Sequence, residues 1–327
     1  MTKVYVNSYV PQTKITDFLV VKESVVKQTK TGKNYAYLTL ADKEGTIPAK
    51  KWDLTPQDIL FFGELNPGEI IKVRGMVDNY NGENQLVIEL IRKANKNDKF
   101  DIKDIIKAAP LESEKMYDFI FNEVIGTIAD AEYRKICETL YEQNKERIMY
   151  WPAGKAIHHD EFGGFLWHIY RMSKNAMVLT ELYPELNRSL LLAGVVLHDI
   201  GKLYEIESTE FGVSPGYTDN GMLLGHLVIG TMIIGETAKK LKMTSEKKLL
   251  LEHLVATHHG KPEWGALHKP CVIEAYFLHH IDMLDMYAYV QEHEVSVVEP
   301  GSYTDRIYAC DNQKLYNPIS SLKINEE

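Results

Sequence analysis

The stretch that decides the fold is residues 190–202, Leu-Leu-Leu-Ala-Gly-Val-Val-Leu-His-Asp-Ile-Gly-Lys, an apolar run that ends in a histidine beside an aspartate. The run predicts a buried helix over 187–198. An apolar core does not accommodate an imidazole next to a carboxylate unless both groups are satisfied. A divalent cation satisfies both, because imidazole nitrogen and carboxylate oxygen are ligands of zinc, manganese and iron. The pair His198-Asp199 therefore predicts metal ligands at the end of a core helix.

Helical periodicity continues on both sides of this stretch. Apolar residues recur at three- and four-residue steps from residue 111 onward, and they predict further helices over 164–182, 221–242, 245–258 and 271–292. The candidate ligands on these helices or at their ends are His168, His226, His258 and Asp282. One histidine from each of several helices, together with two carboxylates, can hold one or two cations inside a bundle. The isolated histidines His253, His268 and His293 fit the commoner role of a satisfied structural histidine.

The first hundred residues predict strands instead of helices. Short apolar or alternating segments are separated by turn-forming residues, and these segments are 18–21, 35–40, 46–52, 70–77 and 85–90. One longer connection spans 53–69. Five short strands in so short a stretch predict a small closed barrel of the OB type.

The two patterns together predict a multidomain α+β protein, with an N-terminal five-stranded OB-type β-barrel followed by an all-α helical bundle. The polar, charged stretch 93–99 marks the boundary between them. We expect four parts, which are the barrel over 1–95, a linker and helical segment over 96–150, the bundle over 151–295 and a C-terminal extension over 296–327.

The charge of the chain is unevenly distributed. The formal charge is −9, from 37 Lys and Arg against 46 Asp and Glu, which argues against a protein that coats nucleic acid electrostatically. Residues 1–98 carry 14 basic and 12 acidic side chains, and the remainder carries 23 and 34. A mildly basic module joined to an acidic one is compatible with a binding module fused to a metal-dependent enzyme, and equally with ordinary solvated surface.

Cysteine usage and hydropathy indicate the compartment. Cys137, Cys271 and Cys310 are far apart and odd in number, so they form no disulfide framework and no CxxC zinc site. The N-terminal segment lacks the apolar region of a signal peptide. The longest purely apolar run, 190–197, is shorter than the roughly 20 residues that cross a bilayer. We expect a cytoplasmic protein with no membrane partner.

The ordered series His168…His198-Asp199…Asp282 resembles the signature of the HD superfamily of metal-dependent phosphohydrolases, an all-helical fold. A larger set of segments resembles YhaM-type 3′→5′ exoribonucleases: 158–168, which ends in Gly-Gly-Phe-Leu-Trp-His, 182–187, 194–202, 224–226 and 258–265, His-His-Gly-Lys-Pro-Glu-Trp-Gly. That family also has an N-terminal OB-fold and a C-terminal segment similar to Glu299-Pro300-Gly301 and the residues after it. The resemblance spans nearly the whole chain.

This resemblance implies roles for individual residues. The primary metal ligands would be His168, His198, Asp199 and Asp282, and a second ion would be completed by His226 and His258. His259 and His159 are further candidates for ligands or for groups behind the ligands; His259 is the weaker because neighbouring helical residues point about 100° apart. Asp199 would be catalytic, as would Lys202, which matches a lysine that meets a substrate phosphate. A solvated lysine at a helix end is the alternative for Lys202.

The implied cofactor is one or two divalent ions. Mn²⁺ is the first candidate, and Co²⁺, Fe²⁺, Zn²⁺ or Mg²⁺ also suit histidine and carboxylate ligands. The cation would acidify a water that attacks the phosphodiester, while Lys202 offsets charge on the phosphoryl oxygens.

The expected substrate contacts lie in both halves of the chain. In the barrel, Tyr35, Tyr37, Trp52 and Tyr80 could stack bases and Arg74 could contact phosphates, together with nearby lysines. Near the candidate ligands, Lys261 could hold a phosphate and Trp264 the terminal base. For each aromatic residue, a place in a hydrophobic core is the alternative interpretation.

Three functions are compatible with these features. The first is a metal-dependent 3′→5′ exonuclease that degrades single-stranded RNA, and also single-stranded DNA, to nucleoside 5′-monophosphates. The second is an HD-domain phosphohydrolase of a small cyclic or signalling nucleotide with a regulatory OB domain. The third is a non-catalytic nucleic-acid-binding adaptor, which would have no reason to keep every ligand type in order. A homo-oligomer is compatible with all three.

Overall fold

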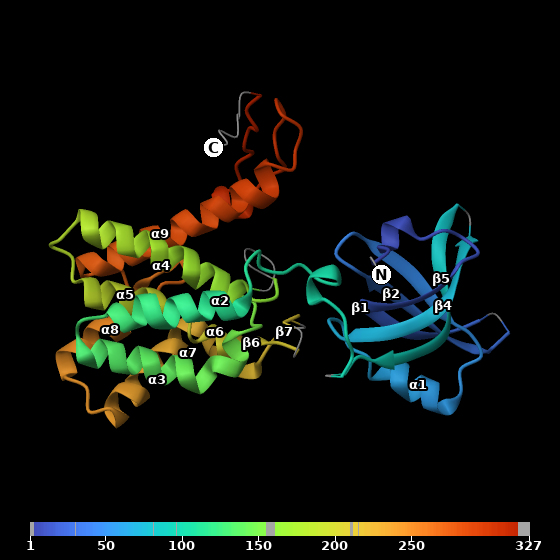
Figure 1. Cartoon of the computed structure of the whole chain (residues 1–327), viewed down its shortest axis with the longest axis horizontal. Coiled ribbons are helices and arrows are strands. Elements are labelled where there is room, and N and C mark those ends of the chain that lie inside the picture. The colour runs from blue at the N-terminus through green and yellow to red at the C-terminus, as the bar shows by residue number, and fades with distance from the viewer. Residues whose placement is uncertain are drawn as a thin grey trace. The chain divides into compact units, whose positions relative to one another are not determined.

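A computed structural model describes residues 3–29, 31–80, 82–95, 97–154, 161–209, 212–214 and 216–319. The chain forms two compact units, one of Met1–Ala108 with Glu207–Gly216 and the other of Ala109–Ile206 with Tyr217–Glu327. The first is built on strands and the second on helices (Figure 1). Each unit has its own hydrophobic core, so each is described by itself.

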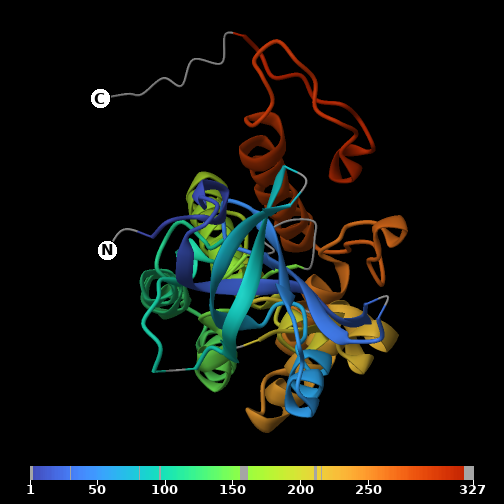
Figure 2. The ribbon, with the colours of Figure 1, turned by 90° about the vertical axis from the view of Figure 1, so that its right-hand side faces the viewer.

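The first unit is the predicted five-stranded barrel. Its strands are β1 (Lys14–Gln28), β2 (Asn34–Ala41), β3 (Thr46–Lys51), β4 (Ile70–Tyr80) and β5 (Glu83–Lys93). They close in the order β1-β2-β3-β5-β4, in which only β3 and β5 pair in parallel. Figure 2 shows these strands crossing one another around the core. Along β2 the side chains alternate as expected for a barrel wall, with Ala36, Leu38 and Leu40 buried and the intervening tyrosines half-buried.

The long connection after β3 contains a helix that we did not predict from the sequence. Helix α1 (Pro56–Gly63) begins at a capping box, in which Thr55 and Asp58 satisfy each other's backbone N–H groups, with Pro56 at the first helical position. Phe62 from this helix is buried in the barrel core. The signal was present as Thr-Pro-x-Asp, but the segment is too short for its periodicity to stand out. Two short 3₁₀ turns, Val6–Ser8 and Ile102–Asp104, complete the unit.

The second unit is the predicted helical bundle. After α2 (Ser113–Asp118), the chain continues through the irregular turns Phe119–Val124 and Ile125–Thr127 into α3 (Ala131–Ile148). The remaining helices are α4 (Gly164–Leu182), α5 (Arg188–Leu197), α6 (Lys202–Glu205), α7 (Asp219–Lys240), α8 (Ser245–Thr257) and α9 (Ile273–Val290). The predicted ends of α4, α5, α7, α8 and α9 agree with these bounds to within two residues.

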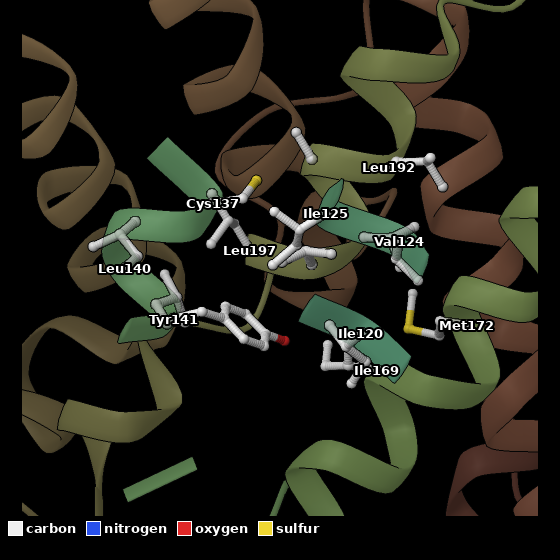
Figure 3. Packing of buried hydrophobic residues seen from close by; sticks show 14 of the residues in the cluster. Ile120, Val124, Ile125, Cys137, Leu140, Tyr141, Ile169, Met172, Leu192 and Leu197 are labelled. Atoms are coloured by element: carbon white, nitrogen blue, oxygen red, sulfur yellow. The ribbon is translucent and has the colours of Figure 1, made fainter. Parts of the chain in front are cut away.

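Helix α5 is the centre of the bundle. All of residues 190–197 are buried, because α3, α4, α8 and α9 surround it. Figure 3 shows the part of this core in which Leu192 and Leu197 lie with Ile120, Cys137 and Ile169 from three other segments. A helix that is apolar on every side must be covered on every side, so its C-terminal end lies inside the unit.

Two further segments belong to this description. Strands β6 (Ile206–Glu207) and β7 (Gly216–Tyr217) pair between α6 and α7. After α9, a π-helical turn Gln291–Val295 leads into the C-terminal extension, where isolated bridges join Tyr303 to Tyr316 and Ile307 to Gln313. Leu315 and Ile307 of this extension pack on Met286 and Val290 of α9.

Within the described part of the chain, α7 alone has the length and hydropathy to cross a membrane. It packs against α6 and α8 and is kinked at Gly225, where φ is +71°. Leu227, Ile229, Ile234 and Ala238 of this helix are buried, whereas Met222, Leu223, Leu224 and Met232 are exposed.

The barrel depends on a close approach that only glycine allows. A Cβ at Gly75 in β4 would lie 2.4 Å from the carbonyl oxygen of Val87 in β5, beside a register shift between Arg74 and Gly75. We expect Gly75→Ala to lower the free energy of unfolding by about 1–3 kcal/mol, because the two strands must separate to admit the methyl group. Urea unfolding followed by circular dichroism measures this. Gly63→Ala, which meets no atom within 4 Å, is the matched control, and equal midpoints for the two variants would contradict the expectation.

Candidate metal centre

Five helices bring seven candidate ligands together. His168 lies on α4, His198 and Asp199 directly follow α5, and His226 follows the kink in α7. The others are His258 and His259 after α8 and Asp282 on α9. Their ligand atoms form three groups, each within 4.8 Å: His168, His198 and Asp282; His198, Asp199 and His258; and His226, His258 and His259.

Asp199 joins two halves of this centre. Its Oδ2 lies 3.3 Å from His198 Nε2 and 3.7 Å from His168 Nε2, and His168 Nε2 lies 3.4 Å from Asp282 Oδ1. Its other oxygen, Oδ1, lies 3.6 Å from His226 Nε2 and 3.7 Å from His258 Nε2. The two oxygens of one carboxylate thus face two separate sets of nitrogens. This is the arrangement of a carboxylate that can bridge two ions.

These candidate ligands are buried, and buried polar atoms require polar partners. His168 and His198 are 0% exposed, and Asp199 and His258 are 1% exposed. Among the residues that the structure describes, Asp199 Oδ1 and His226 Nε2 are buried without a hydrogen-bond partner. Burying such atoms unpaired is costly, and divalent cations satisfy imidazole nitrogens and carboxylate oxygens together. The donor set fits divalent metal ions.

Two of the histidines are oriented by the ends of their own helices. His198 Nδ1 lies 2.9 Å from the carbonyl oxygen of Val195, and His258 Nδ1 lies 2.8 Å from that of Val255. In both cases the imidazole donates to a carbonyl three residues earlier, one that the helix leaves free at its C-terminal end. The proton is thereby held on Nδ1, and the lone pair of Nε2 faces the centre.

The electrostatics favour neutral imidazoles at His258 and His259. At His198, burial opposes protonation, but Asp199 raises the pKa of the imidazole. Burial opposes ionisation of Asp199, but Lys202 and then His198 hold the pKa of this carboxyl well below its ordinary value. Burial, followed by the neighbouring His259, lowers the pKa of His258 well below its ordinary value. Burial and then His226 lower the pKa of His259 to about 4. Neutral imidazole is the form that binds metal ions.

The structure brings His259 into the centre, against the argument from helical geometry. Helix α8 ends at Thr257, and His258-His259 lie in the turn that follows, closed by Gly260 with φ of +76°. The backbone of His258 is still helical, yet the two rings lie 4.5 Å apart between centroids. His259 Nδ1 lies 3.0 Å from the carbonyl oxygen of Trp264. His159, the other secondary candidate, lies outside the described residues.

Of the candidate substrate contacts near the centre, Lys202 and Lys261 are charged and Trp264 is exposed to solvent. Lys202 Nζ lies 2.8 Å from Asp199 Oδ2, and its side chain is 12% exposed, so it is not a solvated lysine. Trp264 is 44% exposed and is not a core residue. The ammonium of Lys261 lies 4.2 Å from the centroid of the Trp264 ring.

The four aromatic candidates of the barrel share a surface, which we call the aromatic strip (Tyr35, Tyr37, Trp52 and Tyr80). Tyr35 and Trp52 stack with centroids 4.8 Å apart. Lys50 lies 5.9 Å from the Trp52 ring and 5.4 Å from the Tyr80 ring, and it pairs with Tyr37 across β2 and β3. Trp52 and Tyr80 are exposed, and the other two tyrosines are half-buried.

The structure does not bring Arg74 to the aromatic strip. Arg74 Nε lies 3.5 Å from Glu89. The side chain lines a separate cleft of about 440 Å³ with Thr16, Lys72, Leu90 and Arg92, which includes no residue of the strip. Alternation of burial along β4 places Arg74 on the outside of the barrel wall, but it does not say which side of a closed barrel an outward residue faces.

Two carboxylates behind the ligands were missed in the sequence analysis. Asp285 Oδ2 lies 2.7 Å from His168 Nδ1, and Glu205 lies 3.1 Å from His226 Nδ1. Asp285 follows Asp282 by three positions, and Glu205 follows Lys202 by three positions. Residues three apart on a helix lie on the same face. That spacing was the available signal.

Comparisons with known proteins identify both units. A family model of the HD domain matches residues 165–287, and a model of the OB-fold nucleic acid binding domain matches residues 20–94. Three relatives bear the name 3′-5′ exoribonuclease YhaM. That of Bacillus licheniformis is 37% identical over 302 residues, covering 92% of this chain and 94% of its own. That of Geobacillus sp. (strain WCH70) is 37% identical over 310 residues, covering 95% and 94%. That of Bacillus subtilis (strain 168) is 35% identical over 304 residues, covering 93% and 95%.

The chain belongs to the YhaM family. The resemblance that the sequence motifs indicated is thereby confirmed, as is the order of an OB-fold barrel followed by a helical HD domain. The segment that matches the HD model runs from α4 to α9 and contains all seven candidate ligands.

The bridging position of Asp199 makes a prediction about metal binding. We expect Asp199→Asn to abolish or severely weaken both equivalents of Mn²⁺, and Asp282→Asn to weaken only one, because Asp282 faces one half of the centre. Isothermal titration of metal-stripped protein measures the stoichiometry and both affinities. Asp118→Asn, an exposed carboxylate at the end of α2, should bind as the parent does. Equal weakening of both equivalents by Asp282→Asn would refute the division into halves.

Proposed function

We propose that this chain hydrolyses single-stranded RNA from its 3′ end and releases nucleoside 5′-monophosphates, with a two-ion centre at the core of its HD domain. The observation that carries the proposal is the position of Asp199, whose two oxygens face two separate sets of imidazole nitrogens. The polarity and the substrate are supported by the name that its relatives bear, 3′-5′ exoribonuclease.

The centre divides its ligands between two cations. The first would be held by His168, His198, Asp199 and Asp282, and the second by Asp199, His226, His258 and His259. When bound, such cations bring the pKa of a water toward neutrality and stabilise negative charge on phosphoryl oxygens. Mn²⁺ is our first candidate, while Co²⁺, Fe²⁺, Zn²⁺ and Mg²⁺ also suit this donor set.

The chain's own residues position the substrate and balance its charge. Lys202 presents a buried ammonium beside Asp199, and its fixed charge can stabilise a phosphoryl oxygen as negative charge grows there. Lys261 can pair with a neighbouring phosphate, and the exposed face of Trp264 can stack on the terminal base. We assign Asp199 and Lys202 as the catalytic residues on this basis.

The aromatic strip suits a flexible single strand. Stacked rings alternate there with lysine side chains, which is how OB-folds hold bases and phosphates without reading sequence. This chemistry would accept single-stranded DNA as well.

The free cysteines Cys137, Cys271 and Cys310 support our proposal of a reducing, cytoplasmic location.

One assay tests the function. On uniformly labelled single-stranded RNA, we expect a chelator to abolish release of mononucleotides and Mn²⁺ to restore it. We expect Asp199→Ala to lower the rate by more than about 100-fold, since even partners behind a metal ligand are worth roughly 10–100-fold. Asp118→Ala serves as the control.

The same assay separates the competing functions. Turnover of a cyclic or signalling nucleotide with no release from RNA would favour the small-nucleotide phosphohydrolase. Binding of RNA with no turnover in any divalent metal would favour the adaptor. Cleavage of a circular single strand would contradict an exonuclease.

The aromatic strip makes a separate prediction about binding. We expect Trp52→Ala to weaken binding of a twenty-nucleotide RNA roughly 5- to 150-fold, because one stacked base is worth about 1–3 kcal/mol. Fluorescence anisotropy at two salt concentrations measures the affinity and its dependence on charge. Leu60→Ala removes an exposed side chain of α1 in the same unit and should leave the affinity within twofold. Equal affinities of Trp52→Ala and the parent would exclude Trp52 from the binding surface.

A further inference from the structure

The histidine ligands differ in what holds their second ring nitrogen. His198 and His258 donate to carbonyls of their own helices. His168 has no such arrangement, because it lies within α4, where backbone carbonyls are used by the helix itself. Its Nδ1 lies instead 2.7 Å from a carboxylate oxygen of Asp285, which comes from α9. The orientation of His168 therefore depends on a residue from a different helix.

Asp285 is itself held by a second partner. It is 1% exposed, so its charge needs compensation inside the protein. Oδ2 faces His168, and Oδ1 lies 2.6 Å from Nε of Arg171. Arg171 lies three residues after His168 on α4, and Asp285 lies three residues after Asp282 on α9. The ligands His168 and Asp282 face each other between the two helices. One turn further along each helix, the ion pair of Arg171 and Asp285 joins them again, and Asp285 also contacts His168.

Arg171 extends this chain of contacts to the surface. Its Nη1 lies 2.9 Å from Oε2 of Glu292, whose side chain is 50% exposed, in the turn that follows α9. Its guanidinium lies 5.4 Å from the centroid of the Trp167 ring. With contacts on several sides, the guanidinium has one orientation, and the planar fork fixes the carboxylate beside it.

We infer that Asp285 and Arg171 are positioning residues for the half of the centre that contains His168. Asp285 holds the proton of His168 on Nδ1 and fixes the ring, so that the Nε2 lone pair faces His198 and Asp282. Arg171 holds the Asp285 carboxylate in place through the 2.6 Å contact of its Nε with Oδ1. A carboxylate behind a ligand imidazole also increases its basicity, which strengthens metal binding. This inference rests on the proposed two-ion centre.

The other half of the centre provides the comparison. His226 is held at Nδ1 by Glu205 at 3.1 Å, and Glu205 also accepts the backbone N–H of His226. Glu205 has no part in the contacts of His168. Asp285 and Glu205 therefore stand behind different halves, and each should affect a different equivalent of metal.

The test compares the two metal equivalents in full-length variants. The variants are Asp285→Asn, Arg171→Gln, Glu205→Gln and Asp130→Asn. The last is the matched control, because it removes a salt bridge of 2.6 Å with Lys247 in the same unit that involves none of the seven candidate ligands. Metal-stripped proteins are titrated with Mn²⁺ by calorimetry, and circular dichroism verifies that each is folded.

We expect Asp285→Asn to weaken one equivalent roughly 10- to 100-fold and to leave the other within threefold. Arg171→Gln should weaken the same equivalent to a smaller extent, Glu205→Gln the other equivalent, and Asp130→Asn neither. In turnover assays at limiting Mn²⁺, Asp285→Asn should lower kcat with little change in KM for RNA, and excess Mn²⁺ should restore much of the rate. A merely structural ion pair would lower thermal stability without changing Mn²⁺ affinity.

The outcomes separate this inference from the function on which it rests. Two unchanged affinities in folded Asp285→Asn would overturn the inference and leave the two-ion centre standing. If Asp285→Asn does not fold, Arg171→Gln decides the matter, since the amide of this variant can still donate a hydrogen bond to the buried carboxylate. Failure of the parent to bind Mn²⁺ saturably would overturn the two-ion centre itself.

Discussion

The buried charge of Asp199 is the constraint on which the rest of the helical unit depends. A carboxylate with 1% exposure at the end of a wholly apolar helix costs several kcal/mol unless opposite charge or donors surround it. Lys202 supplies one ammonium at 2.8 Å, and the imidazoles of four helices face the remaining sides. Each of those helices must present its histidine to the same point, so the geometry of the centre depends on how the helices of the bundle pack.

Much of this geometry comes from ligands that lie at helix ends. His198-Asp199 and His258-His259 follow the last helical residues of α5 and α8, and His226 follows the kink in α7. Neighbouring residues within a helix diverge by about 100°. At these two ends the adjacent residues His198-Asp199 and His258-His259 nevertheless contribute ligand atoms to common groups. Free carbonyls at the same ends orient the rings of His198 and His258. Ligands within helices, such as His168, need partners from elsewhere.

The barrel has a hydrophobic core of its own. Its interior is closed by alternate residues of five strands, so the intervening residues are available for contacts outside it. Tyr35 and Trp52 use that freedom to stack on each other at the surface, close to Lys50. In the function that we propose, the acidic helical unit contributes catalysis and the barrel contributes contacts with the RNA.

The sequence by itself determined the strands, the longer helices and the set of ligand types, because periodicity and the series from His168 to Asp282 depend only on local order along the chain. It did not determine which residues stand behind the ligands. His168 and Asp285 are 117 positions apart and meet only because α4 packs on α9. The sequence also left open whether His259 faces the centre and which side of the closed barrel Arg74 occupies. Local sterics and hydrophobic spacing set the elements, but the direction in which a side chain points is set by the packing of elements that are remote in sequence.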